Sequence, residues 1–138
     1  MLTVYCDGTF DLLHTGHVDF LKKCKQFGNF LIVGVISDKN VESYKRIPII
    51  DLDDRSYLLE NLSIVDKVIK NCPFNNLTRE FIDRYNIDIV VYASDILDST
   101  NSWSNHYKVP IEMGIMKFIE YDKTKISSTK IINSILTR

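Results

Sequence analysis

The sequence predicts an α/β fold in which one parallel sheet of about five strands is covered by helices on both faces. Two observations carry this prediction. Apolar segments of strand length alternate with helical segments along the whole chain, and residues 30–36 form an almost wholly apolar run. Such a run is typical of a parallel strand buried on both faces. Regular alternation of strands and helices favours a sheet that binds ligands at the carboxyl ends of its strands.

The individual elements follow from local patterns. Strands are predicted at residues 2–6, 30–36, 67–69, 87–92 and 116–121, where short apolar segments occur. Helices are predicted at residues 15–27, 51–61, 78–85 and 127–136, with a weaker one within 105–113. Residues 37–50 are polar, basic and interrupted by Pro48, so a long loop is expected there.

Length and composition indicate one domain over residues 1–138. The chain has 138 residues, 45% of them hydrophobic, which is enough for one real core. A net charge of -1 provides no global field for nucleic acid or membrane. No apolar run reaches the roughly 18–20 residues that span a bilayer, and no signal-peptide pattern is expected at the start. Three scattered cysteines are typical of a reduced, cytoplasmic protein.

Residues 5–17 hold the strongest chemical signal, where the first strand passes into the first helix. The segment contains Gly8, Gly16 and two of the three histidines, His14 and His17. Residues three apart on a helix share a face, so both imidazoles are expected to reach one phosphate group. Amides and the dipole at the helix start attract the same anion, and the glycines allow close approach of backbone and phosphate.

A second phosphate signal lies near the other end of the chain. Ser127, Ser128 and Thr129 open the last predicted helix. One hydroxyl is enough to cap a helix, so three in succession favour a helix start aimed at phosphates. Lys45 and Arg46 lie in the predicted loop after the second strand. Each could be a solvated loop charge, or could neutralise phosphate, Lys45 as a point charge and Arg46 through bidentate contacts.

Together these segments resemble the small cytidylyltransferases, the family that makes CDP-alcohols. Residues 8–17 match its GTFDxxHxGH signature, and residues 126–131 match its IS(S/T)T signature. Between them, residues 37–38 match its SD pair, residues 44–45 match its (Y/F)K pair, and residues 53–55 match its acidic–Arg pair. The resemblance implies a Rossmann-like nucleotidyltransferase fold. It also implies transfer of CMP from CTP to a small alcohol phosphate with release of pyrophosphate, Mg²⁺ accompanying the triphosphate, and a cytoplasmic homodimer.

The resemblance implies roles for individual residues. His14, His17 and Lys45 would stabilise the transferring phosphate. The residues expected to bind the nucleotide are Gly8, Thr9, Phe10, Gly16, Arg55, Asp95, Ser127, Ser128 and Thr129. Arg55 would lie near the site and the subunit interface, unless it forms a surface salt bridge. The residues expected to bind the acceptor are Asp7, Asp11, Arg46, Phe74 and Tyr107. His106 has no motif around it and is expected at the surface.

Asp7 bears on the choice of acceptor. A carboxylate beside the acceptor suits a cation, and aromatic faces such as Phe74 and Tyr107 attract a quaternary ammonium group. These residues favour phosphocholine or phosphoethanolamine. Aromatic residues are also common in cores, and Leu12, Leu13 and the small size of the chain also resemble the glycerol-phosphate enzymes of the family. Glycerol 3-phosphate or a sugar phosphate therefore stays open as the alternative.

Residues 122–125 depart from the family pattern. The family usually has RTEG here, whereas this chain has Asp122, Lys123, Thr124 and Lys125. A lysine cannot reproduce the bidentate contact of an arginine. ATP is therefore the alternative nucleotide, and a nucleotide-binding module without catalysis is the alternative function.

Overall fold

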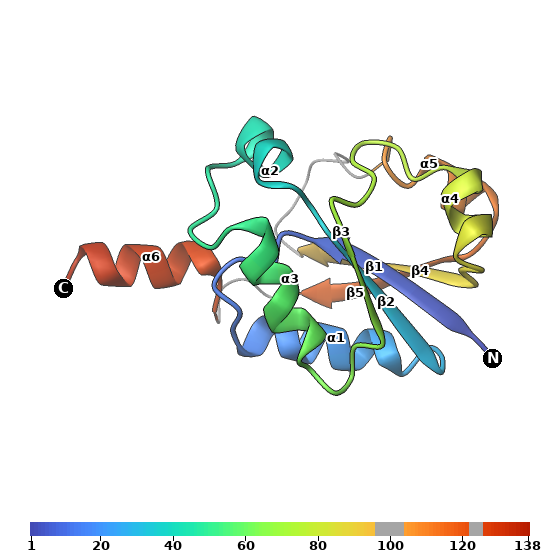
Figure 1. Ribbon diagram of the computed structural model, residues 1–138, viewed down its shortest axis with the longest axis horizontal. Coiled ribbons are helices and arrows are strands. Elements are labelled where there is room, and N and C mark those ends of the chain that lie inside the picture. The colour runs from blue at the N-terminus through green and yellow to red at the C-terminus, as the bar shows by residue number, and fades with distance from the viewer. Residues whose placement is uncertain (96–103, 122–125) are drawn as a thin grey trace.

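Five parallel strands form one sheet in the computed structural model, which describes residues 1–95, 104–121 and 126–138. The strand order is β3-β2-β1-β4-β5 (Figure 1). The strands are β1 (Thr3–Gly8), β2 (Phe30–Val35), β3 (Lys67–Lys70), β4 (Ile89–Asp95) and β5 (Met116–Tyr121). The helices are α1 (Thr15–Lys25), α2 (Asp38–Tyr44), α3 (Leu52–Glu60), α4 (Arg79–Arg84), α5 (Lys108–Glu112) and α6 (Ser128–Leu136). The predicted fold class is confirmed.

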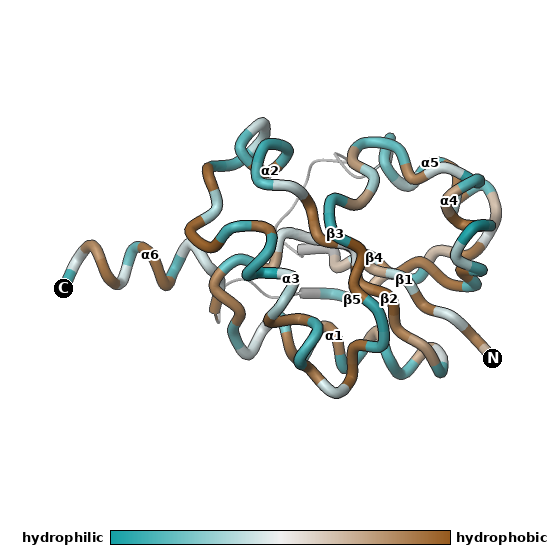
Figure 2. The backbone as a smooth tube through the Cα atoms, viewed as in Figure 1, coloured by the Kyte–Doolittle hydropathy of each residue, from teal (hydrophilic) through white to brown (hydrophobic). Residues whose placement is uncertain are grey.

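The core lies on both faces of β1. Val4 and Cys6 enter a buried cluster with residues of α1 and α3, including Leu21. Tyr5, between them, enters the opposite cluster with Ile82 of α4. Successive side chains of a strand point to opposite faces, so a strand in mid-sheet must be apolar on both. Figure 2 shows this as brown, hydrophobic tube through the central strands.

The strand order opens a crevice beside β1. This strand pairs with β2 along its whole length, from Thr3 to Gly8. Its pairing with β4 is limited to Val4 with Ile89 and Tyr5 with Val90. The two strands therefore part before their carboxyl ends, at the point where successive connections run to opposite sides of the sheet. Ligands of open α/β sheets bind at this kind of switch point.

The prediction of a long loop over residues 37–50 is wrong for the first half of that segment, which forms α2. Ser37 caps this helix, because its Oγ accepts a hydrogen bond from the amide of Asn40 at 3.2 Å. Val41 is its one buried residue. A seven-residue helix with a single buried apolar residue leaves no periodic hydrophobic pattern in the sequence. The capping serine was therefore the only sequence signal for its start.

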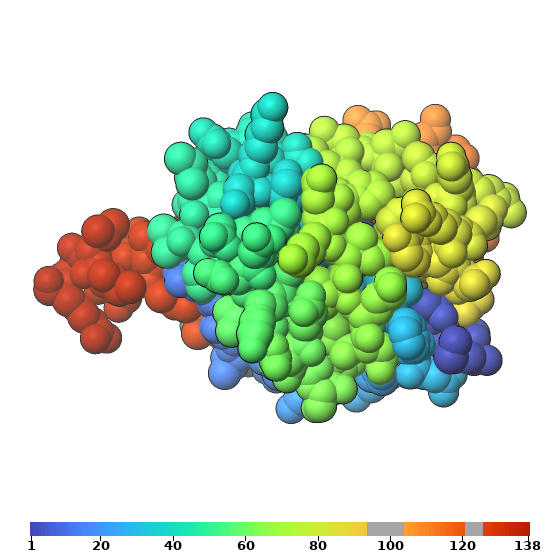
Figure 3. All heavy atoms as spheres, viewed as in Figure 1, coloured from blue at the N-terminus to red at the C-terminus, as the bar shows by residue number. Residues whose placement is uncertain are grey.

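The last helix, α6, projects away from the rest of the molecule (Figures 1 and 3). Its beginning is attached, since Ser128 is buried, whereas Ile135 and Leu136 near its end are exposed. None of the helices in the described residues is long and apolar enough to cross a membrane.

Candidate active site

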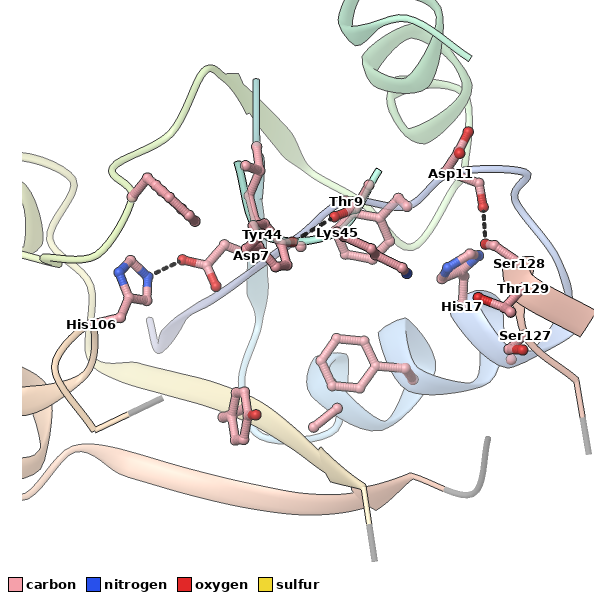
Figure 4. A pocket seen from close by; sticks show the side chains of 18 of the residues that line it. Asp7, Thr9, Asp11, His17, Tyr44, Lys45, His106, Ser127, Ser128 and Thr129 are labelled. Carbon is pink, nitrogen blue, oxygen red and sulfur yellow. Dashed lines mark hydrogen bonds and ion pairs between the residues drawn. The ribbon is translucent and has the colours of Figure 1, made fainter. Parts of the chain in front are cut away.

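A cavity of about 610 Å³ lies at the carboxyl ends of β1 and β4 (Figure 4). It gathers most of the predicted site residues, from both ends of the chain: Asp7, Gly8, Thr9, Phe10, Asp11, His14, Gly16, His17, Lys45, Phe74, Tyr107, Ser127, Ser128 and Thr129. Arg46 and Arg55 do not line it. The side chain of Asp95 lies outside the part of the chain that the structure describes, as do residues 122–125.

The two histidines form a fixed pair at the start of α1. His14 is the N-cap, and its Nδ1 accepts from the amide of Gly16 at 3.1 Å. His17 Nδ1 accepts from the amide of His14 at 3.2 Å, and the two rings stack with centroids 3.9 Å apart. Because each Nδ1 is an acceptor, each neutral ring carries its proton on Nε2. The pair thus holds two N–H donors of the kind that phosphate oxygens accept.

The surroundings keep both imidazoles neutral. Burial lowers the pKa of His17 to about 3, with further lowering from His14 and from the charge of Lys45. Burial also lowers the pKa of His14. Lys45, at the end of α2, lines the same cavity and supplies a positive charge beside His17 (Figure 4). The site therefore combines neutral hydrogen-bond donors with the charge of Lys45.

The loop between β1 and α1 is held in a strained conformation. Phe10 and Leu12 have φ values of 54° and 51°, in the left-handed region that non-glycine residues rarely adopt. The Phe10 ring is buried, with its centroid 5.6 Å from that of His17. A Cβ at Gly8 would lie 3.0 Å from this ring, so Gly8 makes room for Phe10. Strain of this kind clusters at functional sites.

Asp11 was expected to bind the acceptor, but its carboxylate is occupied within the protein. Oδ2 accepts from Arg46 and from the amide of Ile49, both at 2.8 Å, and Oδ1 accepts from the amide of Ile50 at 3.0 Å. Burial raises the pKa of Asp11, but these bonds outweigh it and leave the pKa below its ordinary value. Arg46 is thereby held at Asp11 and outside the cavity lining. Both residues therefore support the loop, and their predicted contact with the acceptor stays a prediction.

Arg55 was expected at the nucleotide or in a surface salt bridge, and it is wholly buried instead. Its guanidinium donates to three backbone carbonyls, those of Thr9 at 2.6 Å, Ile36 at 2.9 Å and Ile50 at 2.9 Å. It also pairs with Asp38 at 2.5 Å. Five fixed donors let one arginine bind several loops at once. Arg55 therefore joins three segments around the cavity without reaching it.

The start of α6 completes the phosphate end of the cavity. Ser127 caps the helix, its Oγ accepting from the amide of Lys130 at 3.1 Å. Ser128 donates through Oγ to the carbonyl of Asp11 at 2.5 Å, which fixes the helix start against the first loop. Thr129 lies beside them on the cavity wall (Figure 4). Two helix N-termini, of α1 and α6, thus meet at one end of the cavity.

The other end of the cavity is built around Asp7. Its Oδ2 accepts from Tyr5 at 3.2 Å and lies 2.7 Å from Nε2 of His106, and the Tyr107 hydroxyl donates to Oδ1. His106, expected at the surface, is therefore a cavity residue (Figure 4). No motif surrounds it, and its contact with Asp7 spans 99 residues of sequence, so only the fold reveals it.

Aromatic rings line the space near Asp7. Phe74 lies on the cavity wall as predicted, and its ring stacks on Tyr44 with centroids 5.6 Å apart. Tyr44, also on the wall, contacts Thr9 Oγ1 through its hydroxyl at 3.1 Å. Tyr44 was missed as a site residue, although its place before Lys45 in the (Y/F)K pair is a signal that could have found it.

Within the described residues, no three or more His, Cys, Asp or Glu side chains are grouped so as to hold a metal ion. The Asp11 carboxylate is already occupied. Mg²⁺ accompanying the triphosphate stays a prediction, in which phosphate oxygens would supply most of its ligands.

Comparisons with known proteins agree with this geometry. A family model described as cytidylyltransferase-like matches residues 5–134. The chain belongs to this family. It is 34% identical over 136 residues to ethanolamine-phosphate cytidylyltransferase of Dictyostelium discoideum, covering 96% of this chain and 37% of that protein. It is 35% identical over 136 residues to choline-phosphate cytidylyltransferase A of Homo sapiens, covering 96% and 36%.

A solved structure gives the same fold. The lipopolysaccharide core biosynthesis protein from Thermoplasma volcanium aligns with a TM-score of 0.67 and 27% identity, covering 88% of this cytidylyltransferase-like chain and 97% of that one. The chain spans only about a third of the length of the curated relatives named above. The predicted family is confirmed.

Proposed function

We propose that this chain transfers CMP from CTP to a small amino-alcohol phosphate, phosphoethanolamine or phosphocholine, forming a CDP-alcohol and pyrophosphate. One observation carries the proposal. The same cavity has the histidine pair and two helix N-termini at one end and the Asp7 carboxylate at the other. The donors at the first end suit the oxygens of a triphosphate, and the Asp7 carboxylate suits the cationic group of an acceptor.

The chemistry needs alignment and charge stabilisation more than covalent help. An oxygen of the acceptor phosphate attacks the α-phosphorus of CTP. The bond from that phosphorus to the bridging oxygen of the β-phosphate breaks, and pyrophosphate leaves with its electron pair. His14 and His17 would donate Nε2–H bonds to the oxygens of the transferring phosphate, while Lys45 offsets the added charge. Mg²⁺, when bound with the nucleotide, would supply further charge neutralisation.

The acceptor end favours a cation. The Asp7 carboxylate faces a cavity with the rings of Phe74, Tyr92 and Tyr107 on its wall. Burial, and then the neighbouring Asp7, raise the pKa of Tyr107 well above its usual value, so its phenol stays a donor. The negative charge of the subsite therefore rests on Asp7. Aromatic faces beside it can attract either a primary or a quaternary ammonium group.

Pyrophosphate release over a matrix of two nucleotides and several acceptors tests the proposal. The nucleotides are CTP and ATP, and the acceptors are phosphoethanolamine, phosphocholine and glycerol 3-phosphate, all with Mg²⁺. We expect release with CTP and an amino-alcohol phosphate. Turnover with glycerol 3-phosphate alone would contradict the assigned acceptor, and turnover with ATP alone would contradict the assigned nucleotide. CTP binding without any release would indicate a module that has lost catalysis. A homodimer is also expected, and analytical ultracentrifugation measures it.

A further inference from the structure

His106 and Asp7 form a pair that the family signature does not contain. Their side chains are 14% and 5% exposed, and Nε2 lies 2.7 Å from Oδ2. The amide of Leu77 donates to the His106 carbonyl at 2.9 Å, and the His106 ring stands edge-on to Tyr107 with centroids 4.5 Å apart. The imidazole is therefore held in place by its backbone and by its neighbour.

The geometry decides which nitrogen carries the proton. An ionised carboxylate only accepts hydrogen bonds, so Nε2 of His106 must donate to Asp7. Within the part of the chain that the structure describes, Nδ1 is buried and has no hydrogen-bond partner. In an imidazolium, Nδ1 would be a second N–H, and burying it unpaired would be costly. The arrangement thus favours a neutral ring that donates through Nε2.

The other described side chains at Asp7, those of Tyr5, Tyr107 and Cys72, add donors but no charge. Tyr5 and Tyr107 both have a pKa raised well above the usual value, first by burial and then by Asp7, so both phenols stay protonated. Burial and Asp7 likewise raise the pKa of Cys72, which lies near Tyr5. With a neutral His106, the cluster keeps the whole negative charge of Asp7.

We propose that His106 is a positioning residue for the acceptor. Its neutral Nε2–H fixes the Asp7 carboxylate toward the cationic end of an amino-alcohol phosphate and leaves the Asp7 charge uncancelled. The inference rests on the proposed function and goes beyond it, because it assigns acceptor affinity to a residue outside the signature motifs.

Two substitutions separate the donor from the rest of the side chain. In His106→Gln the amide nitrogen can occupy the place of Nε2, whereas in His106→Asn it reaches only to about the place of Nδ1. We expect His106→Gln to keep the KM for phosphoethanolamine within about threefold of wild type. We expect His106→Asn to raise that KM about tenfold or more, which is the effect of losing a hydrogen bond to a charged group. The value of kcat and the KM for CTP should change little in both.

The control is Lys108→Gln, which alters an exposed side chain near His106 without touching Asp7. Circular dichroism and thermal unfolding check that each variant is folded. If His106→Asn does not fold, His106→Gln still tests whether the His106 ring carries a positive charge. A lower acceptor KM in His106→Gln than in wild type would mean that His106 is an imidazolium, and would overturn the proposal.

Two other results would also overturn it. One is a wild-type acceptor KM in folded His106→Asn, and the other is equal impairment of the Asn and Gln variants. These outcomes are distinct from failure of the proposed function, in which the wild-type protein itself would release no pyrophosphate from CTP and phosphoethanolamine. In that case the role of His106 fails together with the proposed function, and the inactive wild-type protein identifies the cause.

Discussion

The neutral state of His17 makes a prediction about the stability of the protein. Its pKa in the folded state is about 3, against an ordinary value of 6.5. Between these values the unfolded chain binds more protons at this position than the folded one, so stability falls as pH falls. At pH 5, about 1.5 units below the ordinary value, the loss is about 2 kcal/mol in the free energy of unfolding.

Urea unfolding followed by far-ultraviolet circular dichroism measures the effect. Wild type and His17→Gln are each unfolded at pH 7.5 and pH 5.0. Glutamine does not titrate, so we expect wild type to lose about 2 kcal/mol more than the variant over this interval. Other groups, such as His14 and Asp11, titrate in both proteins and largely cancel in the comparison. Equal losses would refute the buried, neutral state of His17.

Three further predictions concern activity and stability. His14→Ala or His17→Ala should lower kcat/KM for pyrophosphate release by roughly 10²–10³ with the circular dichroism spectrum unchanged, because each removes a preorganised donor; near wild-type rates would contradict the assignment. Asp7→Asn should raise the KM for phosphoethanolamine and spare that for CTP, and a matching rise in both would argue against a separate acceptor end. Arg55→Met should lower the free energy of unfolding by about 3–5 kcal/mol, since it takes the hydrogen-bond donor from the carbonyls of Thr9, Ile36 and Ile50 and the ion-pair partner from half-exposed Asp38; a change in melting temperature of only a few degrees would contradict this.

The sheet and the phosphate end of the cavity were predictable from sequence. Buried parallel strands are short apolar runs, and such runs mark β2 and β4 directly. The phosphate end depends on residues whose chemistry is local, such as a histidine pair three residues apart at a helix start. Signals of this kind survive in a linear reading because their partners are neighbours in the chain.

The parts that were missed depend on contacts distant in sequence. His106 meets Asp7 only because β1 and β4 are adjacent in the sheet, which brings the segment after β4 to the end of β1. Arg55 looks like a surface residue on a helix with charged neighbours, yet its partners are carbonyls of three separate loops. Backbone acceptors have no residue type, so no sequence pattern announces them.

The short connection from Asp7 to Phe10 has a consequence for acceptor length. Only Gly8 and Thr9 separate the carboxylate from the residue whose ring packs near His17. Thr9 is secured by its carbonyl to Arg55 and by its hydroxyl to Tyr44. In the proposed reaction this segment therefore fixes the distance between the Asp7 carboxylate and the histidine pair. An acceptor longer by one methylene would have to withdraw either its ammonium group from Asp7 or its phosphate from the histidines.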